Sequence, residues 1–305
     1  MYTYLLRRIL QMIPVLIGIT LIVFLLVRLT GDPVVLMLGE DARLEDIERL
    51  RTHLGLDRPL YVQYGIFLQD LMRGEFGMSY RYRQQALPLV LERLPATGEL
   101  ALASFLIAVV ISIPAGVISA LRQYSVSDYL ATNVAVLGQA MPNYWLGIML
   151  ILLFSVILGW LPASGRGGIT HLILPALTLG TALAAVLMRL MRSAMLEVMR
   201  QDFVTTARSK GLSERVIIFK HAMRNALIPY VTVLGLQVAV LLGGAIITEQ
   251  VFAWPGMGRI ALIAVNARDM SIVQAVVFVM AMIVMLVNFA VDIIYAIIDP
   301  RIHYS

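Results

Sequence analysis

The chain of 305 residues contains no cysteine, and only 14% of its residues are charged. The absence of cysteine excludes disulfides and thiolate metal sites. Soluble domains carry about 25% charged residues. A chain that combines so little charge with 60% hydrophobic residues would expose a large apolar surface in water. The composition therefore predicts a protein of the lipid bilayer.

The sequence also lacks the common signatures of catalysis. There is no G-x-x-x-x-G-K-[ST] phosphate loop, no H-E-x-x-H zinc motif and no nucleophile elbow. The four histidines are scattered, and the net charge of +5 is not arranged as a basic, aromatic stripe on a soluble domain. We therefore expect no enzyme activity in this chain, no metal, no bound cofactor and no nucleic-acid partner.

Long apolar runs, in contrast, are abundant. A transmembrane helix needs about 20 mainly apolar residues. Six stretches qualify: Ile9–Leu29, Leu100–Leu121, Ala131–Leu158, Leu172–Met191, Ala226–Ile247 and Ile272–Ile298. Proline inside several of them is tolerated, because neighbouring helices can satisfy the freed carbonyl groups. The pattern predicts an all-α polytopic membrane protein with six transmembrane helices.

The first apolar run resembles a secretory signal, because Arg7 and Arg8 precede it. Its apolar core is nevertheless longer than the usual signal core of about 7–15 residues, and no small-residue cleavage site follows it. We interpret residues 1–30 as an uncleaved N-terminal transmembrane helix.

The orientation follows from the basic residues of the short loops, which gather on the cytoplasmic side of membrane proteins. With the N-terminus inside, the inner side carries Arg7, Arg8, Arg122, Arg189, Arg192, Arg200, Arg208, Lys210, Arg215, Lys220, Arg224 and Arg301. The short outer loops carry Arg166, Arg259 and Arg268. Both termini are therefore expected in the cytoplasm.

Residues 31–95 are expected to form a small helical extracytoplasmic segment. Two apolar stripes at helical spacing run through it: Leu44, Ile47, Leu50 and Leu54, then Tyr61, Tyr64, Phe67, Leu68 and Leu71. Gly55 and Gly74 are placed to end the two helices. The aromatic stripe is expected to pack on the membrane domain or to lie at the interface, rather than to contact solute.

Residues 96–305 are expected to form the main transmembrane domain, with a cytoplasmic loop at 193–225. Within that loop, Asp202 can cap a helix and Gly211 can end it, so the stretch between them predicts a short polar helix.

Two further groups of residues are candidates for function. Asp292 is nearly alone as a carboxylate inside the last span, so we expect a structural ion pair with Arg189 or Arg192 rather than a proton relay. Asn143, Tyr144 and Trp145, beside Pro142, are candidates either to line a translocation path or to pack against other helices.

The polar helix and other short motifs together resemble one family. These motifs are Arg7–Arg8, Gly31–Pro33, Leu54–Tyr61, Gly74–Gly77, Arg93–Thr97, Trp160–Pro162, Leu174–Gly180, Asp202–Gly211, His221–Pro229, Val251–Arg259, Asn288, Asp292, Tyr295 and Asp299–Arg301. In this order and spacing, the chain resembles the permease subunit of dipeptide, oligopeptide and nickel ABC importers that bears a large outer segment after its first span. The resemblance implies the type I permease fold of ABC importers.

In that family, a cytoplasmic coupling helix docks into a groove on a separate ATPase subunit. The family pattern begins Glu-Ala-Ala, with Gly four residues after the last Ala; here Thr205-Thr206-Ala207 and Gly211 occupy those positions. The family glutamate is missing, so Asp202, Arg208 and Lys210 are the charged candidates for ATPase contact. Ala207 is expected to face the ATPase groove.

The resemblance also implies partners: a second homologous permease subunit, two ATPase subunits that bind ATP and Mg²⁺, an extracytoplasmic solute-binding protein and the lipid of a bacterial inner membrane. Di- or oligopeptides are the expected solutes, with glutathione or a nickel chelate as related possibilities. One alternative is an ion-coupled secondary transporter, which would need intramembrane carboxylates and an inverted repeat. Another is a membrane receptor or scaffold whose basic loop docks a cytoplasmic partner.

Overall fold

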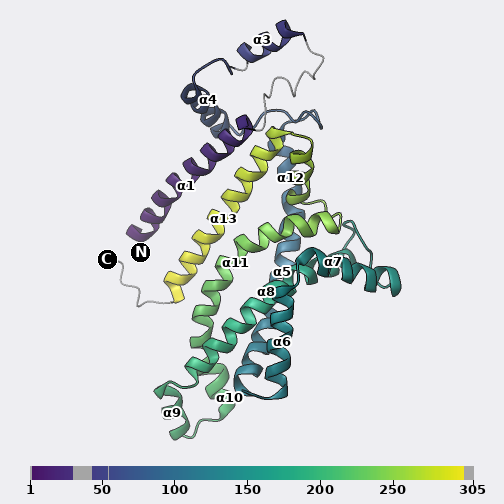
Figure 1. The fold of residues 1–305 in the computed structure, drawn as a ribbon. Coiled ribbons are helices and arrows are strands. Elements are labelled where there is room, and N and C mark those ends of the chain that lie inside the picture. Colours follow the sequence, from purple (N-terminus) through teal and green to yellow (C-terminus); the bar gives the residue numbers. More distant parts are fainter. Residues whose placement is uncertain (1, 30–42, 54, 299–305) are drawn as a thin grey trace. The chain divides into compact units, whose positions relative to one another are not determined.

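The computed structural model describes residues 2–29, 43–53 and 55–298, and these residues form helices joined by turns (Figure 1). The helices are α1 (Tyr2–Leu29), α3 (Leu44–His53), α4 (Leu60–Met72), α5 (Ala86–Leu121), α6 (Val126–Ala140), α7 (Asn143–Leu150), the π-helix η1 (Ile151–Ile157), α8 (Ile169–Val198), α9 (Asp202–Ser209), α10 (Glu214–Val216), the π-helix η2 (Ile217–Ala222), α11 (Met223–Val251), α12 (Met257–Asn266) and α13 (Met270–Ile298). The motifs Gly31–Pro33 and Asp299–Arg301 lie outside the described residues.

The chain divides into two compact units. The first comprises Met1–Pro95 and Gly256–Leu286, and the second comprises Ala96–Pro255 and Val287–Ser305. The long helices α5 and α13 each contribute residues to both units.

The first unit contains the two helices predicted between the first two spans. Gly55 and Gly74 follow α3 and α4 with φ of +66° and +78°, and this confirms the helix ends expected from the sequence. The aromatic stripe of α4 packs on α1. Tyr64 Oη lies 2.9 Å from Thr20 Oγ1, and the Tyr64 ring contacts Phe24 edge-on at 5.2 Å between centroids. Tyr64 and Phe67 therefore pack on α1, whereas Tyr61 is exposed.

The second unit is built around α8, which contacts α6, α7 and α11. Its core contains Leu187, Met191 and Met195 of α8, together with Ala226 and Tyr230 of α11. Helices α5 and α8 approach closely at a glycine: a Cβ added at Gly180 would lie only 2.8 Å from the Ser104 carbonyl oxygen. Small residues at helix contacts allow this closeness, as is usual in membranes.

Among the described residues, four helical stretches are long and apolar enough to cross a membrane: Ala86–Leu121, Ile169–Val198, Glu214–Val251 and Met270–Ile293. A fifth crossing results if α6 and α7 together form one broken span. Helix α1 adds the shorter apolar stretch Leu10–Leu25.

The third predicted span, Ala131–Leu158, is not a continuous helix, and this corrects the sequence interpretation. Helices α6 and α7 meet at an angle of 105°. Met141 has ψ of 129°, and Pro142 is the N-cap of α7 with ψ of 135°. Proline disfavours a helical conformation in the residue before it. The chain therefore leaves one helix at Met141 and starts another at Asn143.

Two of the family motifs meet inside the second unit. The fully buried Trp254 donates its indole N–H to the carbonyl oxygen of Ala96 at 2.8 Å. Nearby in sequence, Thr97 donates to the buried carboxylate of Glu249 at 2.6 Å. These contacts tie α5, at Ala96 and Thr97, to the C-terminal end of α11.

Candidate functional site

The polar segment between α8 and α11 folds as a short helix at one end of the second unit (Figure 1). Helix α9 begins at Asp202, as the sequence predicts, but Asp202 is the first helical residue rather than the cap. The N-cap is Gln201, whose side chain makes no capping hydrogen bond. An acidic residue in the first turn still interacts favourably with the positive end of the helix dipole.

The C-terminal end of α9 is closed by Gly211, as predicted. Gly211 has φ of +78°. Its N–H donates to the Arg208 carbonyl at 2.9 Å, and the Leu212 N–H donates to the Ala207 carbonyl at 3.3 Å. This pair of bonds is a Schellman motif, which requires a left-handed residue after the helix. Glycine adopts that conformation without the steric cost that a Cβ brings.

The position of Ala207 corrects the sequence interpretation. Ala207 is only 8% exposed, and it forms a small apolar cluster with Val204 and Ile217. Met199 and Phe203 pack against the same cluster. Ala207 thus faces the π-helix η2 of its own chain, not outward toward a partner. Val204 and Ala207 are three residues apart and so share one side of the helix. That this side is buried is evident only from its packing against Ile217 of η2.

The opposite face of α9 is exposed and polar. Asp202, Thr205, Thr206 and Ser209 are exposed side chains at positions i, i+3, i+4 and i+7, which share one side of a helix. The helix therefore has a buried side that packs on η2. Its exposed side carries three hydroxyl groups and one carboxylate, and is available to another protein.

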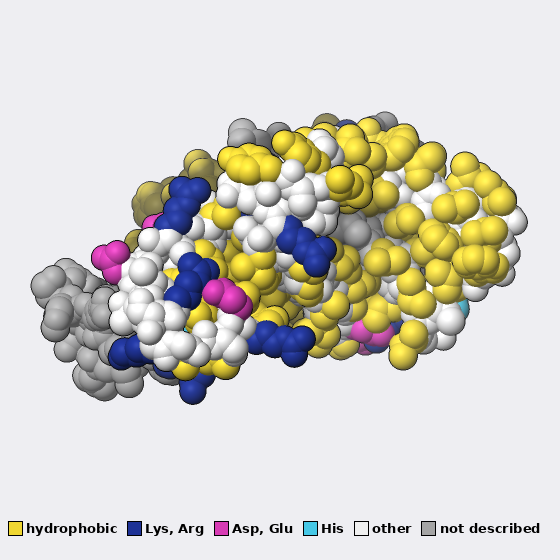
Figure 2. All heavy atoms as spheres, turned by 90° about the horizontal axis from the view of Figure 1, so that it is seen from below, with side chains coloured by type: hydrophobic (Ala, Val, Ile, Leu, Met, Phe, Trp, Pro, Cys, Tyr) yellow, Lys and Arg dark blue, Asp and Glu magenta, His cyan; other side chains and the backbone are white. Residues whose placement is uncertain are grey.

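Basic side chains surround this end of the second unit. Figure 2 looks onto it from below and shows dark-blue Lys and Arg side chains gathered there. The exposed basic residues of the segment are Arg200, Arg208, Lys210, Arg215, Lys220 and Arg224. Arg208 pairs with Glu214 across the turn, with 2.7 Å between Nε and Oε1. The hydrogen bond and the charge of Glu214 raise the pKa of the Arg208 guanidinium above its ordinary value.

A buried ion pair stands near the same end of α8. Asp128 is 4% exposed and receives two hydrogen bonds from Arg192, at 2.7 Å from Nε and 2.8 Å from Nη2. Ser119 Oγ and the Tyr124 backbone N–H also donate to this carboxylate. The contacts join α5, the α5–α6 turn, α6 and α8.

This ion pair corrects the predicted partner of Arg192. The sequence suggested Asp292, because Asp292 is the carboxylate inside the last predicted span. In the structure, Arg192 pairs with the carboxylate of Asp128 instead. Arg189, the other predicted partner, donates from Nη1 to Gln139 Oε1 at 2.9 Å. The signal that sequence reasoning missed is the position of Asp128 in the first turn of α6, directly after the turn that closes α5.

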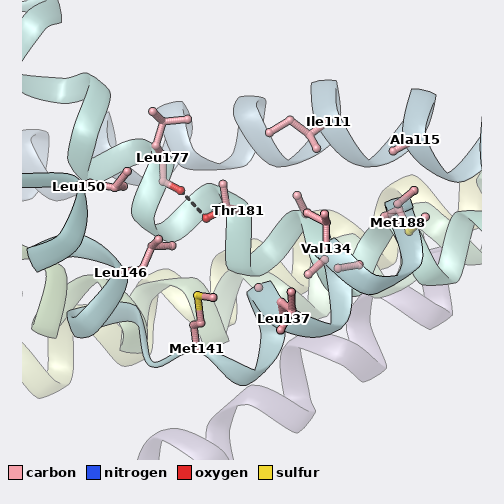
Figure 3. A pocket seen from close by; sticks show the side chains of 15 residues that line it. Ile111, Ala115, Val134, Leu137, Met141, Leu146, Leu150, Leu177, Thr181 and Met188 are labelled. Atoms are coloured by element: carbon pink, nitrogen blue, oxygen red, sulfur yellow. Dashed lines mark hydrogen bonds between the residues drawn. The ribbon is translucent and has the colours of Figure 1, made fainter. Parts of the chain in front are cut away.

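One large pocket of the second unit is apolar. It has a volume of about 500 Å³ and lies between α5, α6, α7 and α8 (Figure 3). Its lining includes Ile111, Leu137, Met141 and Leu146. The hydroxyl of Thr181, which borders it, is already bonded to the Leu177 carbonyl at 2.7 Å, the dashed line of Figure 3. Such a lining suits hydrocarbon better than a polar solute.

The three candidate path residues at the start of α7 have different surroundings. Tyr144 and Trp145 are 49% and 44% exposed. Asn143 is half-buried and borders a second pocket of about 100 Å³ between α7, α8 and α11. The three side chains therefore do not share one site.

Comparison with known proteins identifies the class to which this architecture belongs. Residues 112–304 match the family described as the inner membrane component of binding-protein-dependent transport systems, and residues 1–101 match the N-terminal part of such membrane components. The chain belongs to this family of multi-pass permease subunits of bacterial ABC transporters.

The chain is similar over its full length to peptide permeases. It is 43% identical over 335 residues to the di/tripeptide transport system permease protein DppB of Pseudomonas aeruginosa, with all of both chains covered. It is 41% identical over 333 residues to the dipeptide transport system permease protein DppB of Alkalihalophilus pseudofirmus, again with full coverage of both.

A solved structure shares the fold. An inward-facing structure of the MetNI methionine ABC transporter superposes with a TM-score of 0.60 at 20% identity, covering 69% of this chain and 96% of that chain. At this identity the likeness shows the fold alone. It confirms the expected type I importer fold of the membrane domain.

Proposed function

We propose that this chain is a permease subunit of an ATP-driven importer that moves di- or oligopeptides, or a closely related small solute, into the cytoplasm. The observation that carries the proposal is the full-length similarity, above 40% identity, to permeases named for dipeptide and di/tripeptide transport. The fold and the exposed helix α9 agree with it.

The proposed partners are a second homologous permease, two ATPase subunits and an extracytoplasmic solute-binding protein. In this assembly ATP and Mg²⁺ bind to the ATPase subunits, and solute crosses between the two permeases. Helix α9 is the proposed contact with an ATPase, through Asp202, Thr205, Thr206, Arg208 and Lys210. Because the buried face of α9 packs on η2, a displacement of α9 by the ATPase is expected to move α8 and α11 as well. A flexible loop would not transmit this motion.

The proposed topology has six spans in a bacterial inner membrane, with both termini in the cytoplasm. Residues 1–30 form the first span, 31–95 an extracytoplasmic helical segment, and 96–305 the permease domain with its coupling loop at 193–225. The basic patch around α9 supports this orientation, because basic residues gather on the cytoplasmic side.

Transport by the complete importer tests the proposed function. The four kinds of subunit are reconstituted in vesicles, and the uptake of a radiolabelled di- or tripeptide is measured with ATP and with a non-hydrolysable analogue. We expect uptake only with hydrolysable ATP. Uptake driven by an ion gradient without ATP would favour a secondary transporter, and partner binding without any uptake would favour a receptor or scaffold.

Cysteine labelling tests the orientation. The natural chain has no cysteine, so only the introduced cysteine can react. Arg122→Cys and Arg208→Cys are expected to react only with reagents that enter the cytoplasm, and Glu45→Cys with impermeant reagents added outside. Labelling of Arg208→Cys from outside in intact cells would contradict the orientation.

A further inference from the structure

Two side-chain amides border the smaller pocket of the second unit. The pocket has a volume of about 100 Å³ and lies between α7, α8 and α11. Asn143 and Gln237 line it together with Gly244 and with apolar side chains of α8 and α11, among them Leu241. Both amides are half-buried, and in the part of the chain that the structure describes neither side chain makes a hydrogen bond.

Such an arrangement is unusual inside a membrane-spanning helix. Gln237 lies at the middle of α11, whose bounds are Met223 and Val251. A polar side chain at this depth that meets neither lipid headgroups nor protein partners is costly, and polar groups within spans generally face a bundle interior or a solute path. The amides therefore have hydrogen-bonding capacity that this chain by itself leaves unused.

The backbone around the pocket is shaped to hold Asn143 there. A Cβ added at Gly244 would lie 3.4 Å from Asn143 Nδ2, so the amide packs against α11 at van der Waals distance. One turn further along α7, a Cβ added at Gly147 would lie 3.1 Å from the Phe252 ring. The chain breaks at Pro142, α7 then contacts α11, and glycine at position 147 allows the approach to Phe252.

The spacing of the amides suits a peptide backbone. Gly244, next to Asn143, lies seven residues from Gln237, which corresponds to about 10 Å along a helix. An extended peptide spans about 3.3–3.6 Å per residue, so about three of its residues cover this distance, and the two amides can contact one peptide backbone at separate points. The pocket has room for roughly three water molecules at about 30 Å³ each. This space admits part of a peptide backbone but no whole peptide.

Resting on the proposed function, we propose that Asn143 and Gln237 form a specificity-determining contact for the peptide backbone of the solute during its passage. An amide offers both a donor and an acceptor, and a peptide group needs both. The contact is independent of the solute's side chains, so it serves peptides of varied sequence.

The test compares two solutes in vesicles that contain the complete importer. One is labelled trialanine, and the other is its ester analogue, in which one backbone N–H is replaced by oxygen. Uptake is measured for the natural chain, for Asn143→Leu and Gln237→Leu, and for Leu241→Met as an apolar control in the same pocket. The discrimination that the binding protein contributes is common to all variants, so the variant-to-natural ratio reports on the pocket.

We expect the two leucine variants to import trialanine about tenfold more slowly, the effect of one lost hydrogen bond, and to lose most of the preference for peptide over ester. Leu241→Met keeps both the rate and the preference. Co-purification of the second permease and the ATPases is unchanged in all variants.

Three outcomes overturn the proposal. If the leucine variants keep the natural rate and preference, the amides do not contact the backbone, although the proposed function stands. If they lose the second permease, the amides serve a helix contact between subunits. If the natural chain imports no peptide in a fully assembled importer, the proposed function fails, and this inference fails with it.

Discussion

The second unit contains two arginine–carboxylate pairs of the same chemistry in opposite surroundings. Arg192 and Asp128 meet at 2.7 Å with side-chain exposures of 26% and 5%. Arg208 and Glu214 also meet at 2.7 Å, but their exposures are 46% and 57%. Distance alone therefore does not separate the two pairs, whereas burial does.

The difference predicts different roles. In the buried pair, the Asp128 carboxylate also accepts hydrogen bonds from Ser119 and the Tyr124 backbone, so removal of one member leaves several buried groups without a partner. In the exposed pair, water and dissolved ions compete for both charged groups and weaken their attraction. We infer that the first pair holds α5, α6 and α8 together, and that the second only shapes the turn after α9.

The largest effect is expected from breaking the buried pair. Asp128→Asn removes the charge, keeps the shape and leaves the Arg192 guanidinium half-buried and unpaired. Loss of one partner of a buried pair costs about 3–5 kcal/mol, which corresponds to a fall of roughly 5–8 °C in melting temperature for a chain of this size. Thermal unfolding in detergent measures it, together with the yield of folded protein.

A double variant sharpens this prediction. Asp128→Leu with Arg192→Leu replaces the pair by apolar side chains, and such replacements are often neutral or stabilising. We expect the double variant to melt close to the natural chain. If Asp128→Asn has the melting temperature of the natural chain, the pair does not hold α5, α6 and α8 together.

The second effect concerns the buried face of α9. Ala207→Asp places a carboxylate against Val204 and Ile217, and a buried charge without a partner destabilises by about 3 kcal/mol or more. We expect local unfolding of α9, faster proteolysis between α8 and α11, and loss of the ATPase subunits on purification. Thr206→Asp is the matched control on the exposed face and is expected to leave α9 resistant to protease.

This comparison separates anchoring from docking. If Ala207→Asp resists protease like the natural chain but releases the ATPase, Ala207 contacts the partner directly, as the family pattern first suggested. If Thr206→Asp also releases the ATPase without local unfolding, the exposed face of α9 is the contact.

The sequence predicted those parts of the fold that depend on local signals. The helix from Asp202, its end at Gly211 and the ends of α3 and α4 at Gly55 and Gly74 all follow from residues within one turn, and the structure confirms them. The break at Pro142 was not predicted. Proline continues inside α1 and α8, at Pro14 and Pro175, so only the packing around α7 decides which proline ends a helix.

The candidate site was predicted less completely, for a similar reason. Which face of α9 is buried depends on η2, ten residues further along the chain. The partner of Arg192 depends on how α6 lies against α8. The two amides of the small pocket come from α7 and α11 and are distant in sequence. Composition and periodicity carry no information on such pairings, because each is set by tertiary packing.

A smaller effect is expected at the end of α9. Gly211→Val forces a β-branched residue into a left-handed conformation, which costs about 1–2 kcal/mol. Space is not the cause, because a Cβ at this position meets nothing within 4 Å. Gly211→Asn is the control, since asparagine tolerates this conformation better. We expect ATP hydrolysis to be partly uncoupled from peptide uptake in Gly211→Val and nearly normal in Gly211→Asn; equal behaviour of both would contradict a conformational role.

The smallest effect is expected from breaking the exposed pair. We expect no measurable effect at all, and this null result is informative. Glu214→Ala removes the partner of Arg208 from a turn that is held independently by the Schellman motif at Gly211. Glu214 raises the already high pKa of Arg208, so Arg208 stays protonated near neutral pH with or without it. We expect no change in melting temperature, in ATPase co-purification or in the dependence of transport on pH between about 6 and 9. A destabilisation as large as that of Asp128→Asn would show that burial does not distinguish the two pairs, and that α9 depends on its surface charges more than on its packed face.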